Sequence, residues 1–212
     1  IAPGQDILAG VSPVTTGRLF DLLSGTSMSS PHVAGLAALF KELRPGWSPM
    51  AIKSALMTTG TDVLDGGTPP AAETSPVLIF RQGAGHVSPT RATDPGLVFD
   101  SSFADWLSFL CAVQPGGGCA GVTPIDPSNL NGASIAIGDM AGVQTVTRRV
   151  TNVGTNPATY TASVNGMAGF TVAVTPASLS LAVGETKAFA VTFTRTTAAL
   201  NAYAGGQLRL AD

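Results

Sequence analysis

One serine of the chain stands in a setting that could make it a nucleophile. Ser27 follows a tight turn at Gly25 and precedes a long apolar segment with the composition of a buried helix. A serine at a helix N-terminus lies at the positive end of the helix dipole, where its backbone N–H can help to hold an oxyanion. By spacing and turn chemistry alone, an ordinary helix N-cap is the more common role. The Gly-x-Ser-x-Gly turn of α/β-hydrolases is disfavoured, because Ser29 replaces its second glycine.

The chain contains two histidines that could be considered as a base for this serine. His32 follows Ser27 on the same expected helix, about 140° around the helix axis, so its ring should point elsewhere. His86 lies in a glycine-rich turn. We expect a structural role for both histidines, and without a base a serine hydroxyl is a weak nucleophile.

The composition restricts the class of protein and partner. Of the 212 residues, 44% are hydrophobic and 11% are charged, and the formal net charge is -2, so no basic field supports a nucleic-acid partner. No stretch reaches the roughly 18 consecutive apolar residues of a membrane span. The start, Ile1-Ala2-Pro3-Gly4, lacks the charged first region of a signal peptide, and the chain is expected to begin inside a longer protein.

The sequence predicts no cofactor and no metal site. Asp62, Asp65 and Glu73 lie in or near a glycine-containing loop, but three carboxylates fall short of the roughly six to eight oxygens that calcium takes. Cys111 and Cys119 are separated by a flexible Pro-Gly-Gly-Gly segment. Two readings remain open for them: a disulfide in an oxidising compartment, or two unrelated free thiols. A zinc knuckle is excluded, because no second Cys or His pair accompanies them.

The hydrophobic pattern of the first half predicts a mixture of strands, helices and loops. A short strand is expected at 20–23 and a helix at about 28–43, with Pro31 in its first turn, where a missing N–H has no partner to lose. Its segment 33–40 is apolar on every side, which is typical of a helix inside a domain.

Further elements follow along the first half. Ser48 is a good N-cap for a second helix that ends before Gly60. A third helix is expected near 103–110, where apolar residues recur at helical spacing. Residues 61–100 otherwise look like loop, with one strand at 77–80.

After Cys119 the hydrophobic period changes from that of a helix to that of a strand. Segments rich in Thr, Val, Phe and Tyr alternate apolar with polar residues and are separated by turn signals. Short strands at this spacing predict an antiparallel β-sandwich. The expected strands are 145–153, 158–164, 170–175, 179–181, 187–194 and 207–210.

The segment that contains Ser27 closely resembles the nucleophile motif of the subtilases. Residues 25–35, Gly-Thr-Ser-Met-Ser-Ser-Pro-His-Val-Ala-Gly, match this long and specific pattern, and Ser27 falls on the family's nucleophile. The resemblance continues downstream and is strongest to the plant cucumisin-type branch and its bacterial relatives. The further matching segments are 2–4, 7–9, 47–49, 52–59, 83–87 and 94–100.

The resemblance implies two domains. Residues 1–113 would form the C-terminal part of a subtilisin-like α/β catalytic domain, 114–127 a linker, and 128–212 an all-β fibronectin type III-like sandwich. Residues 147–154, Thr-Arg-Arg-Val-Thr-Asn-Val-Gly, are similar to the opening strand and turn of that sandwich, and 128–136 look like the strand before it. We expect the chain to stop before the last strand of the sandwich.

The resemblance implies a secreted serine endopeptidase that forms an acyl-enzyme on Ser27 with a polypeptide substrate. In subtilases the triad Asp and His and the oxyanion Asn precede the serine, so they are expected in an N-terminal part upstream of Ile1. Without that part the chain should be inactive. Two alternatives remain: a non-catalytic interaction module based on the β-sandwich, and a pseudoprotease that is inactive even at full length.

Overall fold

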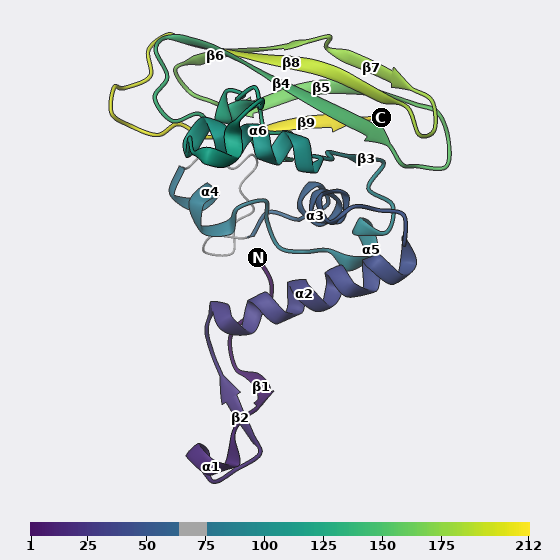
Figure 1. Cartoon of the computed structure of the whole chain (residues 1–212), viewed down its shortest axis with the longest axis vertical. Coiled ribbons are helices and arrows are strands. Elements are labelled where there is room, and N and C mark those ends of the chain that lie inside the picture. Colours follow the sequence, from purple (N-terminus) through teal and green to yellow (C-terminus); the bar gives the residue numbers. More distant parts are fainter. Residues whose placement is uncertain (64–75) are drawn as a thin grey trace.

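The computed structural model describes residues 1–63 and 76–212. Figure 1 shows three regions along the long axis: a protruding hairpin beside the helix α2 (Thr26–Leu43), a middle group of helices, and a β-sandwich at the opposite end. Within the described residues, no helix combines the length and apolar character needed to cross a membrane. The α/β region followed by a sandwich confirms the predicted fold class.

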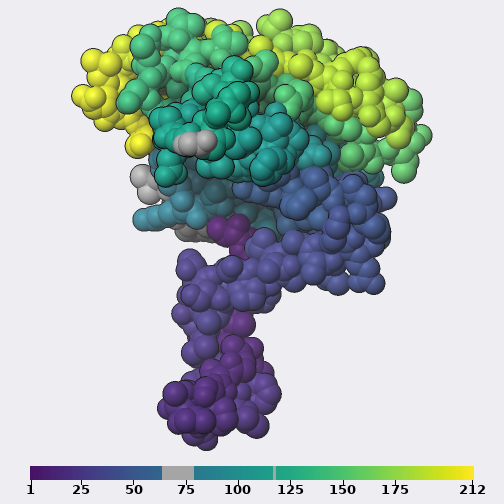
Figure 2. All heavy atoms as spheres, in the orientation of Figure 1, coloured from purple at the N-terminus to yellow at the C-terminus, as the bar shows by residue number. Residues whose placement is uncertain are grey.

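The N-terminal hairpin consists of β1 (Ile7–Gly10), the short helix α1 (Pro13–Thr16) and β2 (Phe20–Leu23). The two strands pair antiparallel, which confirms the strand expected at 20–23. Leu8, Phe20 and Leu22 are each more than 60% exposed. In Figure 2 the hairpin stands away from the rest of the molecule. Leu8 pairs with Leu22, and Phe20 lies two residues from Leu22, so one face of the hairpin presents these apolar side chains without cover from the described chain.

Helix α2 spans Thr26–Leu43 and begins two residues earlier than expected. Pro31 consequently lies inside the helix rather than in its first turn, because the turn at Gly25 already starts the helix. Within the described chain Phe40 is the buried residue of α2, whereas Leu39 is 62% exposed, so the apolar segment 33–40 is only partly covered here. Only one face of α2 meets other described elements.

Helix α3 (Pro49–Thr58) organises the middle of the molecule and confirms the second predicted helix. The Ser48 hydroxyl accepts a hydrogen bond from the Ala51 N–H, as an N-cap does. One side of α3 packs with α2 through a cluster that also includes α5 (Pro89–Ala92). The other side, Ala51 and Ala55, packs against Val98 and Val153. Small residues on this side let the backbones approach closely.

The segment expected as a strand at 77–80 is helical, and α4 spans Pro76–Gln82. A short apolar run has no periodicity of its own, so the run alone cannot distinguish a strand from a turn of helix. The strand in this region is instead β3 (Leu97–Val98), which pairs antiparallel with β4 (Val143–Asn152) of the sandwich. The first half of the chain thus contributes a strand to a sheet of the second half.

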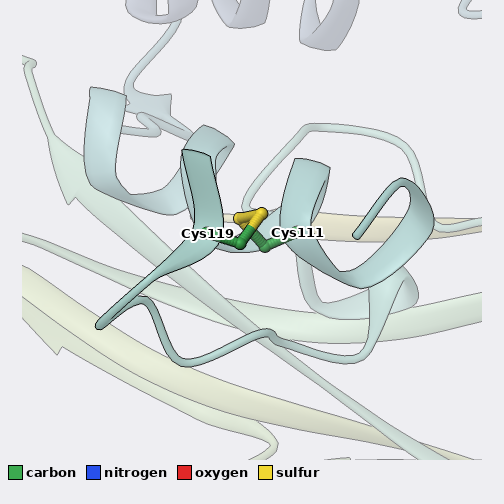
Figure 3. The surroundings of a disulfide bond; sticks show 2 residues. All are labelled: Cys111 and Cys119. Atoms are coloured by element: carbon green, nitrogen blue, oxygen red, sulfur yellow. A yellow bond between two sulfur atoms is a disulfide. The ribbon is translucent and has the colours of Figure 1, made fainter. Parts of the chain in front are cut away.

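Helix α6 (Phe103–Val113) confirms the third predicted helix. A capping box starts it, with Ser102 and Asp105 each bonding the other's backbone N–H. Phe103, however, is 83% exposed. Cys111 near the end of α6 forms a disulfide with Cys119 in the 3₁₀ turn η1 (Gly117–Cys119), as Figure 3 shows. Of the two readings of the cysteines, the disulfide is confirmed.

The sandwich confirms all six predicted strands, with shifts of at most two residues at their ends. One sheet has the order β3-β4-β8-β6 and the other β7-β5-β9, and all pairs are antiparallel. Val146, Val150, Phe189 and Val191 are buried between the sheets with exposures of 2% or less. The strands are β4 (Val143–Asn152), β5 (Ala158–Gly166), β6 (Phe170–Thr175), β7 (Ser178–Leu181), β8 (Thr186–Arg195) and β9 (Gly206–Ala211).

The strand expected at 128–136 is absent from this part of the described chain. It begins with a 3₁₀ turn, η2 (Pro127–Asn129), and continues without regular structure. Two asparagine side chains take over the pairing with the edge of β4: Asn129 Oδ1 accepts from the Thr147 N–H, and Asn131 Oδ1 accepts from the Arg149 N–H. Because side chains satisfy these donors, no backbone ladder is needed here.

The two halves of the chain are joined by polar contacts as well as by β3. The Asn131 side chain donates to the Asp100 carbonyl oxygen, and the Gln207 side chain of β9 donates to the Asp62 carboxylate. Arg149 of β4 forms an ion pair with Asp105 of α6, with 3.0 Å between Nη2 and Oδ1. The division into 1–113, 114–127 and 128–212 stays a prediction.

Candidate active site

The turn before Ser27 requires glycine at two positions. Gly25, the N-cap of α2, has φ 151° and ψ 169°, a region that residues with a side chain rarely enter. Its N–H donates to the Gly4 carbonyl at 2.7 Å. A Cβ on Gly4 would lie 2.8 Å from the Gly25 carbonyl oxygen and would also collide with Ser29. The Ala-Pro-Gly segment at the chain start therefore supports the turn, a role visible in the sequence only as part of the family match.

Ser27 is the second residue of α2, and its side chain is exposed. Its hydroxyl makes no hydrogen bond to another residue of the described chain, so it is available to a substrate. The Met28 N–H donates to the Gly25 carbonyl, whereas the N–H groups before it have no acceptor within the helix. An unpaired N–H at Ser27, at the positive end of α2, can stabilise a developing oxyanion.

Neither histidine hydrogen-bonds to Ser27. His32 is exposed, and its Nδ1 lies 2.7 Å from the Met28 carbonyl oxygen in the preceding turn of α2. His86 exchanges backbone hydrogen bonds with Thr61, and its Nδ1 lies 3.0 Å from the Val87 carbonyl oxygen. Each ring nitrogen thus lies against a backbone carbonyl oxygen rather than against Ser27, and the structural roles of both histidines stay a prediction.

Of the three acidic residues considered for a metal ion, only Asp62 lies among the described residues. The carboxylate of Asp62 accepts hydrogen bonds from the side chains of Gln82 and Gln207. Asp65 and Glu73 lie outside the described residues. Among residues 1–63 and 76–212, no three His, Cys, Asp or Glu side chains are gathered so that they could hold a metal.

Comparison with known proteins places both halves of the chain. The profile of the subtilase family matches residues 1–85, and that of a fibronectin type-III domain matches residues 129–212. Over 99% of its length the chain is 41% identical to subtilisin-like protease SBT2.6 of Arabidopsis thaliana, of which it covers 29%. It is 42% identical over 90% of its length to subtilisin-like protease SBT5.3 of the same plant, covering 27% of it.

A third relative is subtilisin-like serine-protease S of Lotus japonicus, 38% identical over 91% of the chain and covered to 28%. The chain thus spans less than a third of the length of these curated relatives. The match begins at residue 1 and includes the whole turn and helix that carry Ser27. By these matches over both halves, the chain belongs to the subtilase family and joins a subtilase segment to a fibronectin type-III domain.

Proposed function

We propose that this chain is part of a serine endopeptidase in which Ser27 attacks the peptide bond and forms an acyl-enzyme. The observation that carries the proposal is the exposed Ser27 hydroxyl at the N-terminus of α2, within the segment matched by the subtilase family. The names of the relatives describe them as subtilisin-like proteases, which supports the same activity here.

The reaction assigned to this chain has two parts. The Ser27 Oγ bonds to the scissile carbonyl carbon while its proton passes to a base, and the negative charge that develops on the carbonyl oxygen is held by the Ser27 N–H. When the tetrahedral intermediate collapses, the C–N bond breaks and the amine leaves with the proton from the base. Water then attacks the ester in the same way and restores the free hydroxyl.

We propose that the base and its supporting groups come from the remainder of the protein. The chain covers less than a third of its relatives, and neither of its histidines bonds to Ser27. In subtilisin, loss of the histidine alone lowers kcat by about 10⁶-fold. The 212-residue chain by itself is therefore expected to show no useful proteolysis.

The same remainder is proposed to cover the exposed side of α2 and the hairpin. Leu39 and Leu43 on α2 and Leu22 on β2 are each more than half exposed, although the helix is apolar around most of its circumference. A helix of this composition is stable in water only with a partner on its open face. The peptide substrate would then bind between Ser27 and this N-terminal part.

We further propose that the protein acts in an oxidising compartment outside the cytosol. The disulfide between Cys111 and Cys119 supports this location, because such bonds persist in secreted proteins and are rare in reducing compartments.

Labelling with a fluorophosphonate tests the proposed nucleophile. The reagent phosphonylates an activated serine Oγ with loss of fluoride, and intact mass followed by a peptide map locates the adduct. We expect the full-length protein to be labelled on Ser27, Ser27→Ala to be unlabelled, and Ser30→Ala, an exposed serine three residues away, to be labelled normally. An unlabelled full-length protein would support the pseudoprotease alternative. Labelling of the 212-residue chain alone would contradict the proposal that the base comes from the remainder of the protein.

A further inference from the structure

A cavity lies at the junction of the two halves, away from Ser27. It has a volume of ≈ 190 Å³, is partly open to solvent, and is bordered by α3, α6 and the irregular segment 127–136 beside β4. Most of its lining is apolar, and two of the lining residues, Lys53 and Arg148, are cationic. The main apolar contributors are Met50, Met57, Phe99, Trp106 and Leu130.

Arg148 is a charged residue buried at this cavity, with 2% of its surface exposed. Its guanidinium donates four hydrogen bonds, and all four acceptors are backbone carbonyl oxygens, those of Ser128, Gly132, Ser134 and Thr147. A guanidinium has five N–H groups. Since Nη2 donates only one of its two hydrogens within the described chain, one N–H remains for another acceptor.

The positive charge of Arg148 has no carboxylate partner among the described residues. The ion pairs there involve other arginines and a lysine, and Arg148 is in none of them. Burial lowers the pKa of Arg148 to about 10, so the group is still protonated at neutral pH. The carboxylate of Asp126, two residues before Ser128, accepts hydrogen bonds from the side chains of Ser128 and Gln144.

A buried charge without a counter-charge is unfavourable, even where carbonyl dipoles satisfy most of its N–H groups. A bound anion would supply the missing charge and accept the remaining N–H. Lys53 is exposed and lines the same cavity, so it would attract the same anion from solvent. The apolar walls would bury a non-polar group attached to that anion.

We propose that this cavity is a binding site for a small carboxylate that carries an apolar or aromatic group. Its volume is slightly larger than the ~150 Å³ apolar cavity that holds benzene. A carboxylate beside Arg148 and a ring against Trp106 and Met50 would use both kinds of lining. Because the cavity touches α3 and α6 as well as the sandwich segment, an occupant would link the two halves of the chain.

Phenylacetate serves as the probe, and phenylacetamide is the matched uncharged control of nearly the same shape. Binding to the full-length protein is measured by ligand-observed NMR titration. We expect saturable binding of phenylacetate and about tenfold weaker binding of phenylacetamide, because a hydrogen bond to a charged group is stronger than a neutral one.

Two variants leave the buried bonds of Arg148 intact and locate the site. Lys53→Gln removes the exposed charge and should weaken phenylacetate binding about two- to fivefold. Ala136→Phe fills the cavity from an exposed lining position and should abolish binding. Equal binding of the two probes, no binding at millimolar concentration, or unchanged binding to Ala136→Phe would each overturn the proposal. None of these readouts depends on Ser27 or on proteolysis.

Discussion

Replacing Asn131 with alanine should destabilise the junction between the two halves of the chain. The side chain is buried, with 2% exposure for the residue. Its Nδ2 donates to the carbonyl oxygens of Asp100 and Arg149 at 2.8 and 3.0 Å, and its Oδ1 accepts from the Arg149 N–H at 2.7 Å. The variant loses three hydrogen bonds and leaves their backbone partners without a replacement.

At about 1 kcal/mol for each bond, Asn131→Ala should lower the free energy of unfolding by about 3 kcal/mol. Asn129→Ala is the matched control. Its Oδ1 also accepts from a β4 backbone N–H, that of Thr147, but this contact is exposed. Water can replace the lost acceptor there, so a change below about 1 kcal/mol is expected.

Calorimetric unfolding of the full-length protein provides the measurement. For a cooperative unit of the size of this 212-residue chain, about 3 kcal/mol corresponds to a drop in Tm of roughly 6–12 °C. The control should lower Tm by about 3 °C or less. The transition to follow is the one that Asn131→Ala shifts most. If the two variants lower Tm equally, the buried hydrogen bonds of Asn131 stabilise the protein no more than the exposed bond of Asn129, and the reasoning is refuted.

Three other changes have defined outcomes. Replacing both cysteines by serine opens a short loop and should cost about 2.5 kcal/mol of local stability, seen as faster amide hydrogen exchange at the end of α6; unchanged exchange would contradict this. Burial by itself would raise the pKa of Asp105, but hydrogen bonds from Ser102 and Arg149 lower it overall below 3.8. Ionised Asp105 therefore stabilises the fold at higher pH. In urea unfolding, the free energy of unfolding of Asp105→Asn should be about 1 kcal/mol lower than that of the unchanged protein, and this difference should vanish as the pH falls below 3.8. A difference that stays constant down to pH 2 would contradict this. A Cβ at Gly35 would meet no atom within 4 Å in the described chain, so Gly35→Ala should raise the helicity of the 212-residue chain. If the remainder of the protein covers α2, the same variant should lower the Tm of the full-length protein. A rise in both helicity and Tm would contradict the proposal that α2 is covered.

Much of the fold was predictable because its signals are local. The alternation of apolar and polar residues in β4 and β8 places Val146, Val150 and Phe189 on one face, and that face is the observed core. The N-cap and proline at Ser48 and Pro49 start α3 where expected. The error at 77–80 arose where a short apolar run had no period to read.

The contacts that join distant segments could not be predicted in the same way. Nothing near Leu97 and Val98 in the sequence indicates that they pair with β4 more than fifty residues later. The side chains of Asn129 and Asn131 substitute for an expected strand, and this depends on where β4 ends up beside them. Such pairings depend on where the chain reverses direction, and the spacing of apolar residues within one segment does not indicate this.

The sequence by itself determined the candidate nucleophile, the family and the order of the two domains. Ser27 is recognisable because turn, helix start and motif are contiguous, and local geometry follows from contiguous residues. Only the tertiary structure decided which face of α2 is left open, how the halves are joined, and that Arg148 is buried against four carbonyl oxygens beside a cavity. Burial depends on what the rest of the chain brings to a residue, and a linear pattern does not contain that information.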